Sequence, residues 1–269
     1  MKIKYEKGDT FLHRLNPLTR LLVLVAYSIA IFTFDSLEIE LICFLALLLI
    51  MALLRSKALL SLVVSKYLLS FVLLIFLVQV IFTRGDELIF TIPLVLFNIE
   101  VTTGGILIGL IIAFRFLTII LGSAVFVFTT DPNELAYALM KAGLPYRFGF
   151  MLVTAIRFIP IFESEAGTVR NAQAARGLEI DQGGARGILK TVRYTLMPLI
   201  VSALSKVDVL VISMEGRAFG LTASRSFLRP VRFGAADSII SLTTIITLTL
   251  LVANVWLGFF TLPHLILYY

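Results

Sequence analysis

The chain has 269 residues, of which 59% are hydrophobic and only 15% are charged, and its mean hydropathy is +1.01. These values lie outside the range of soluble domains, so we expect an all-α integral membrane protein. The single cysteine, Cys43, excludes a disulfide framework and a thiolate metal cluster on this chain. The two histidines lie at opposite ends of the chain, so no metal site is expected.

Five apolar runs are candidate membrane spans, because a spanning helix needs about 20 mostly apolar residues. In chain order they cover roughly residues 18–34, 37–54, 59–82, 104–128 and 238–260. Residues 129–235 instead mix apolar stretches with many arginines. We therefore predict about five transmembrane helices, divided into an N-terminal membrane region at 1–130, a cytoplasmic helical region at 131–235 and a C-terminal membrane helix at 236–269.

The distribution of charge predicts an orientation, because Lys and Arg in short loops are retained in the cytoplasm. Basic residues precede the first run and separate the second from the third, whereas the alternate loops are more acidic, with Asp35, Glu38 and Glu40 in the first of them. The N-terminus and residues 129–235 are therefore predicted to be cytoplasmic. The net charge of +6 is interpreted as this orientation signal and as a surface for anionic membrane lipid. No nucleic-acid partner is expected, because no basic stretch is interleaved with aromatic residues.

Two helix starts are marked by a capping side chain followed by proline. Asn16 precedes Pro17, and Asp131 precedes Pro132. The second pair is predicted to begin a short amphipathic helix that Gly143 ends.

Two long helices are predicted within residues 129–235. One runs from about residue 147 to 177, with a kink expected at Pro160, and the other from about residue 191 or 197 to 218. Both begin apolar and contain small residues at helical spacing, which permits a close helix crossing. Both end in an arginine with small neighbours, as Ala175-Arg176-Gly177 and Gly216-Arg217-Ala218.

Two interpretations of Arg176 and Arg217 remain open. As helix caps, cations in the last turn offset the carbonyl dipole by about 0.3–1 kcal/mol. As docking residues, each would enter an acidic groove on a partner, where a charge-assisted hydrogen bond contributes about 1.5–3 kcal/mol. The small neighbours favour docking, because they let the walls of a groove approach closely. Glu215 either steers the second arginine or balances its charge.

Two other arginines are interpreted differently. Ala185-Arg186-Gly187 spells a similar triplet but follows two glycines, so we assign it to a turn. Arg115 lies near the middle of the fourth apolar run, where a charge costs about 2.5–3.5 kcal/mol. We predict a structural or coupling role for it, with a carboxylate or helix carbonyls as its partner.

Several of these stretches together resemble a known family. "LHRLNPLTRLL", "TTDPNELAYALMKAGLP", "AQAARG", "SALSKVDVL" and "MEGRAFG" occur in that order between about Phe11 and Gly220. They resemble the EcfT family, the transmembrane coupling subunits of energy-coupling factor transporters, which includes the CbiQ-type proteins. The second triplet departs from the commoner Ala-Arg-Gly by having glycine first and alanine last, which keeps both neighbours small.

The resemblance implies a non-catalytic importer subunit in a prokaryotic plasma membrane. Two long cytoplasmic coupling helices would cross, and their triplets, centred on Arg176 and Arg217, would dock into two ATP-binding subunits of the EcfA type, as a homodimer or heterodimer. A separate substrate-binding membrane S component would capture a vitamin or metal ion. The resemblance places ATP and Mg on the partners and no cofactor on this chain, which has no G-x-x-x-x-G-K-[ST] sequence.

Two other functions fit the sequence less well. A self-sufficient secondary transporter needs ionisable groups at mid-membrane and broken helices in repeated halves, whereas the spans are nearly free of charge apart from Arg115 and the region of Pro160. An intramembrane protease would have to use Glu163 and Glu165, which form no catalytic constellation without histidines or an embedded nucleophile. We interpret these carboxylates as solvating groups or as ion-pair partners of nearby arginines.

Overall fold

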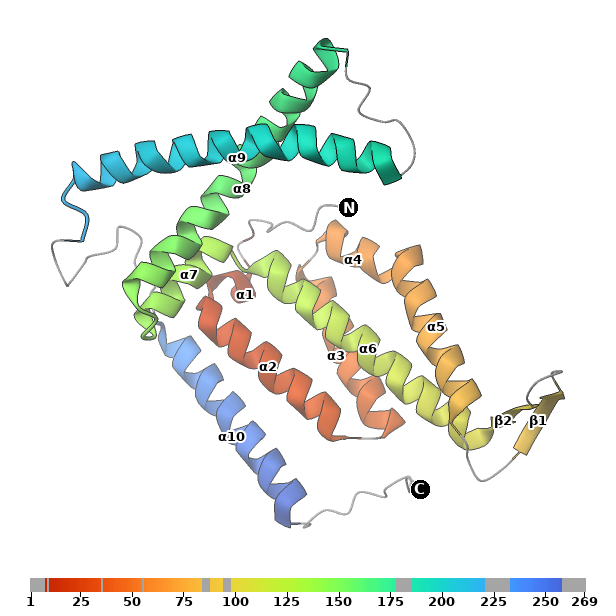
Figure 1. Ribbon diagram of the computed structural model, residues 1–269. Coiled ribbons are helices and arrows are strands. Elements are labelled where there is room, and N and C mark those ends of the chain that lie inside the picture. Colours follow the sequence, from red (N-terminus) through yellow and green to blue (C-terminus); the bar gives the residue numbers. More distant parts are fainter. Residues whose placement is uncertain are drawn as a thin grey trace. The chain divides into compact units, whose positions relative to one another are not determined.

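The computed structural model describes residue 8 and residues 10–34, 36–54, 56–83, 88–93, 98–177, 185–220 and 233–257. Over these residues the chain is almost entirely helical, which confirms the predicted all-α fold (Figure 1). It forms two compact units, one of Met1–Ala138 with Arg232–Tyr269 and one of Leu139–Val231. The three membrane and cytoplasmic regions stay a prediction, because compactness does not report membrane location.

The first unit contains helices that follow the apolar runs closely. Its elements are α1 (Phe11–Arg14), α2 (Pro17–Thr33), α3 (Leu37–Leu54), α4 (Lys57–Val63), α5 (Lys66–Phe82), β1 (Leu88–Pro93), β2 (Asn98–Thr102), α6 (Thr103–Thr129) and α10 (Ala235–Leu257). Helix α7 (Pro132–Lys141) follows α6 and leads into the second unit, which contains α8 (Tyr146–Ala175) and α9 (Ala185–Glu215).

Among the described residues, five helical stretches are long and apolar enough to cross a membrane. They are Leu37–Leu54, Leu59–Phe82, Thr103–Thr129, Val192–Glu215 and Ala235–Ala253. The predicted number of candidate spans is confirmed, but these five stretches are not the same five that the sequence predicts. The first predicted run is the shorter apolar helix Pro17–Thr33, and Val192–Glu215 within α9 meets the length and composition of a span.

The third apolar run is divided, which the sequence analysis did not anticipate. Helix α4 ends at Val63, and the backbone of Ser65 is extended (φ −63°, ψ 124°) before α5 begins at Lys66. The two-stranded hairpin between α5 and α6 was also missed. There β1 and β2 pair antiparallel, with Leu88 opposite Thr102 and Pro93 opposite Asn98.

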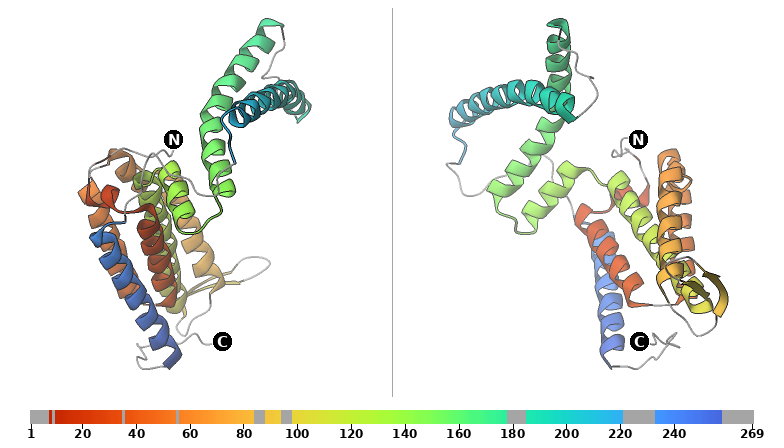
Figure 2. Two further views of the ribbon diagram at one scale, coloured as in Figure 1. Left: turned by 90° about the vertical axis from the view of Figure 1, so that its left-hand side faces the viewer. Right: turned by 45° about the vertical axis from the view of Figure 1, so that its right-hand side comes forward.

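Helix α6 is the centre of the first unit, where it packs against α2, α3, α4 and α5 (Figure 2). Gly109 permits the close approach of α5, because a Cβ there would lie 3.2 Å from the Phe76 ring and 3.3 Å from Val80. The buried core joins three helices and consists of Leu47, Met51, Leu54, Leu59, Leu117, Leu121, Val125 and Phe128.

Arg20 fastens the amino-terminal segment to the end of α6. Its buried guanidinium donates to the carbonyls of His13 (2.6 Å) and Leu15 (2.5 Å), and also to the carbonyl of Thr129. Arginine suits this position because its fixed fork of donors can serve several acceptors at once. One side chain therefore holds together the turn before α2 and the last turn of α6.

Asp237 joins the beginnings of α2 and α10. Its buried carboxylate accepts hydrogen bonds from the backbone N–H of Asn16 (2.7 Å) and of Gly234 (2.9 Å). Asn16 in turn caps α2 by accepting from the Leu18 N–H (3.0 Å), as the Asn-Pro pair predicted. A carboxylate at two helix starts also favours both helix dipoles.

Replacing Asp237 with alanine should lower the free energy of unfolding by about 1–3 kcal/mol, because it leaves the buried N–H of Asn16 without its acceptor and removes the part-buried hydrogen bond from Gly234. Thermal unfolding in detergent measures the effect, with Asp208→Ala, which removes an exposed aspartate, as the matched control. Equal melting temperatures for the two variants would contradict the assignment of this junction.

Candidate functional site

Two arginine triplets end the two long helices of the second unit. Helix α8 ends at Ala175 with Pro160 in its interior, and α9 ends at Glu215. The two helices cross, and their carboxyl ends point in different directions (Figures 1 and 2). We call residues 175–177 the first tip and residues 216–218 the second tip.

The first tip is a left-handed helix ending. Arg176 is the C-cap residue, and its N–H donates to the Gln173 carbonyl (3.1 Å). Gly177 follows with φ +80°, and its N–H donates to the Ala174 carbonyl (2.9 Å). Glycine suits this place because it has no Cβ to oppose a positive φ. Ala175, Arg176 and Gly177 are all exposed.

The second tip has the same backbone form with a different residue at the left-handed position. Ala218 has φ +56°, and its N–H donates to the Glu215 carbonyl (2.9 Å). The Phe219 N–H reaches back to the Met214 carbonyl (3.0 Å), which completes a Schellman ending. Arg217 therefore occupies the same C-cap position as Arg176. Gly216, Arg217 and Ala218 are also exposed.

The geometry of the two tips is compatible with both interpretations of the arginines, as helix caps and as docking residues. A cation at the C-cap position favours the helix dipole, and small exposed neighbours leave room around each arginine for a partner. The docking role of Ala175, Arg176, Gly177, Gly216, Arg217 and Ala218 stays a prediction. Glu215, the exposed last residue of α9, supplies a carbonyl to the second ending. Its steering role stays a prediction too.

The third triplet was misplaced by the sequence analysis. Helix α9 begins at Ala185 rather than near residue 191 or 197, so Arg186 and Gly187 belong to its first turn and not to a separate turn. The two preceding glycines, at 183 and 184, lie outside the described residues. A glycine pair does not prevent a helix from starting directly after it, and one glycine inside a helix costs only about 1 kcal/mol. This triplet therefore opens a helix, whereas both tips end one.

A polar contact fixes the point at which α8 and α9 cross. Glu165 of α8 forms an ion pair with Lys206 of α9, with 2.8 Å between Nζ and Oε2, and accepts a hydrogen bond from Ser202. The sequence predicts an arginine as the ion-pair partner of Glu165, and this prediction is wrong because the partner is Lys206. The hydrogen bonds from Lys206 and from Ser202 lower the pKa of the Glu165 carboxyl below its ordinary value of 4.5.

Phe219 is a contact residue that the sequence analysis missed. It directly follows the second tip and lies against two rings near the start of α8, with ring centroids 4.7 Å from Phe150 and 5.8 Å from Tyr146. The available signal was a large apolar residue after the left-handed position, because Schellman endings place such a residue against an apolar neighbour.

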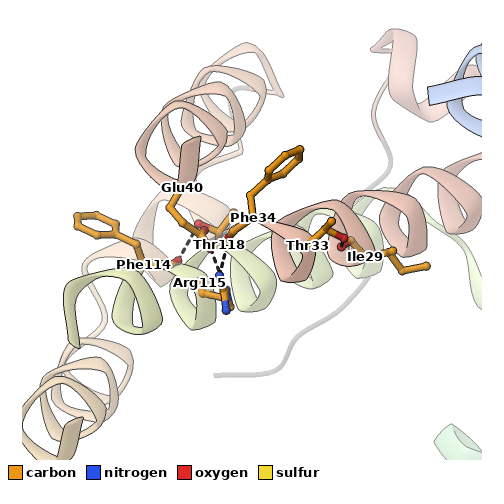
Figure 3. A network of polar contacts seen from close by, with 7 residues as sticks. All are labelled: Ile29, Thr33, Phe34, Glu40, Phe114, Arg115 and Thr118. Atoms are coloured by element: carbon orange, nitrogen blue, oxygen red, sulfur yellow. Dashed lines mark hydrogen bonds and ion pairs between the residues drawn. The ribbon is translucent and has the colours of Figure 1, made fainter. Parts of the chain in front are cut away.

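Arg115 of the first unit has the partners that its position required (Figure 3). Its Nε donates to Oε1 of Glu40 (2.8 Å), and its terminal NH2 group donates to the Phe34 carbonyl (2.7 Å). The guanidinium carbon also lies 5.6 Å from the centroid of the Phe32 ring. Arg115 therefore has both kinds of partner that the sequence predicts, a carboxylate and a carbonyl at a helix end.

Glu40 was wrongly assigned to a loop. It lies in the first turn of α3, and its side chain is only 1% exposed. Glu40 thus places a negative charge at the positive start of α3, while Arg115 neutralises the carbonyl end of α2. The ion pair between Arg115 and Glu40 therefore attaches the connection between helices α2 and α3 to α6.

Arg115→Met should lower the free energy of unfolding by about 3–5 kcal/mol, because the Glu40 carboxylate would stay buried without its counter-charge. The double variant Arg115→Met with Glu40→Met should recover much of the loss. Chemical unfolding in detergent across the double-mutant cycle measures the coupling. Additive effects of the two substitutions would show that the pair does not interact.

The crossing should weaken in acid. Because the pKa of Glu165 is lowered in the folded state, its contribution to stability is present above the ordinary value of about 4.5 and is lost as the pH falls through the lower folded value. Spin labels at the exposed positions Gly167 and Val201 should give a narrow distance distribution at pH 7 that broadens toward pH 3. Glu165→Gln should give the broad distribution throughout, and a pH-independent narrow distribution in the wild type would contradict the assignment.

Comparisons with known proteins identify the family of this chain. The family model described as "Cobalt transport protein" (CbiQ) matches residues 8–227. The chain is 31% identical to "Energy-coupling factor transporter transmembrane protein EcfT" of Lactococcus lactis subsp. cremoris, over 93% of this chain and 95% of that protein. It is 27% identical to the protein of the same name from Bacillus subtilis, over 92% and 95% of the two chains. The chain belongs to the CbiQ family and is an EcfT-type transmembrane subunit of an energy-coupling factor transporter.

Proposed function

We propose that this chain transmits ATP-driven motion from two ATP-binding subunits to a separate substrate-binding membrane subunit, for uptake of a vitamin or metal ion. The first and second tips dock into grooves on the two ATP-binding subunits. ATP and Mg bind to those partners, and this chain performs no chemistry. The name shared by its relatives describes a transmembrane protein of an energy-coupling factor transporter, which supports the assignment.

The observation that carries this proposal is the common geometry of the two tips. Their sequences differ, yet Arg176 and Arg217 take the same C-cap position before a left-handed residue. At the second tip that residue is Ala218, and a non-glycine residue in the left-handed region costs about 1 kcal/mol or more. A helix cap alone would be better served by glycine. An exposed strained turn beside an arginine supports a recognition role instead.

The proposed orientation places the N-terminus and the helices α8 and α9 in the cytoplasm. The basic residues before α2 and between α3 and α5 support it through the positive-inside rule. Although Val192–Glu215 is apolar enough to span a membrane, it carries Lys206 and Asp208, and Lys206 pairs with Glu165 of α8. Charges paired at a helix crossing fit a cytoplasmic or interfacial position better than the lipid interior.

Charge reversal at the tips tests the docking proposal. Arg176→Glu and Arg217→Glu should each weaken co-purification with the cognate ATP-binding pair, and the double variant should abolish both association and ATP-driven uptake. Removal of a charge-assisted hydrogen bond in a buried groove lowers affinity by about tenfold or more. Pull-down from solubilised membranes measures association.

Arg186→Glu is the matched control, since Arg186 belongs to a similar triplet that begins a helix. It should leave association unchanged. If all four variants associate as the wild type does, the two arginines are helix caps and the docking proposal fails.

A further inference from the structure

The second tip is attached to the start of α8 by an aromatic cluster. Phe219 contacts Phe150 and Tyr146, and the rings of Tyr146 and Phe150 stack on one another with centroids 6.1 Å apart. The hydrogen bond from the Phe219 N–H to Met214 fixes the turn that carries this side chain. Offset aromatic pairs are directional as well as apolar, so the cluster restrains the position of the turn.

Within the described part of α8 and α9, this cluster adds to a second, polar attachment between α8 and the end of α9. That attachment is the crossing, where Glu165 meets Ser202 and Lys206. The part of α8 from Tyr146 to Glu165 and the part of α9 from Ser202 to Glu215 therefore form two sides of a triangle (Figure 1). The turn with Phe219 closes the third side. Because its sides have fixed lengths, a closed triangle keeps its shape even where one corner can pivot.

The first tip lies outside this triangle. It begins at Ala175, ten residues beyond Glu165 along α8, which is a distance of about 15 Å at the helical rise of 1.5 Å per residue. Ala174 to Gly177 at its end are exposed, and among the described residues no atom outside the adjacent chain lies within 4 Å of the place where a Cβ of Gly177 would be. The two tips are therefore held differently. The second tip is held by the Phe219 cluster and by the crossing at Glu165, whereas the first tip lies at the end of an arm beyond that crossing.

The base of α8 is also packed closely against the end of α7. Gly149 is buried, and a Cβ added there would overlap the side chain of Met140. Only Thr130 and Asp131 separate α7 from α6 along the chain. Helix α7 is thus joined to the α8 base by packing at Met140 and to α6 by a short covalent link.

We propose that Phe219 is a positioning residue that makes the second tip and the base of α8 move as one body, while the first tip moves relative to that body. This inference rests on the proposed docking function. It assigns the two ATP-binding subunits different mechanical roles: the one at Arg217 displaces the α8 base directly, and the one at Arg176 acts through the arm beyond the crossing.

Distances between spin labels test this proposal without knowledge of the transported substrate. In a Cys43→Ser background, which removes the single cysteine, labels at Met151 and Ile212 report the braced tip against the α8 base. Both positions are exposed. A second pair at Ala174 and Ile212 reports the first tip. The purified complex with its ATP-binding pair is compared without nucleotide and with ATP plus vanadate.

In the wild type the Met151–Ile212 distance should stay unchanged between the two states, whereas the Ala174–Ile212 distance should shift. Phe219→Ala should lose the narrow Met151–Ile212 distribution while association and ATP hydrolysis persist, and Phe219→Trp should restore it. Phe148→Ala removes an exposed ring from the same part of α8 and should have no effect.

Three results would overturn the inference. They are a nucleotide-dependent shift of the Met151–Ile212 distance in the wild type, an unchanged narrow distribution in Phe219→Ala, and loss of association in that variant, which would make Phe219 a docking residue. A different result would show that the proposed docking function is wrong. In that case the chain would still associate with the ATP-binding pair after the double charge reversal of Arg176 and Arg217, whatever the label distances show.

Discussion

A charged group inside an apolar protein must find its partner within the protein, and the first unit is organised by this constraint. Arg115 joins α6 to the end of α2 and to Glu40 at the start of α3. Arg20 joins the turn before α2 to the end of α6, and Asp237 joins the starts of α2 and α10. Apolar contacts between such helices carry little directional information. These few polar contacts therefore determine which helix ends lie together.

Helix ends serve a different purpose in the second unit. Within the first unit Arg20, Arg115 and Asp237 bind several helix ends, whereas both tips leave their last turn exposed. Each tip combines an exposed end of the helix dipole, a cation and a left-handed turn, and the proposed docking would use these three features to bind an acidic groove. Because the backbone form is shared, an alanine at position 218 and a glycine at position 177 can present the two arginines in the same way.

The contact at Glu165 and the contact at Phe219 differ in physical character, and this difference matters for coupling. An ion pair on a partly exposed crossing is screened by water and contributes modestly, so it can act as a pivot. Packed aromatic rings lose contact area with small displacements, so they hold a position more rigidly. Together the two contacts turn a pair of crossed helices into a frame with one free arm.

The sequence by itself determined the helical membrane class, most helix boundaries, the Asn16 cap and the two arginine endings, because all of these depend on local composition and on the periodicity of neighbouring residues. It also required a partner for Arg115, since an unpaired charge is too costly in an apolar run. Only the tertiary structure decided that this partner is Glu40, 75 residues away along the chain. It likewise placed Phe219 against the start of α8 and divided the third run at Ser65. Such pairings depend on which helices pack together. The sequence alone does not decide this, because many apolar helix surfaces of similar shape could pack against one another equally well.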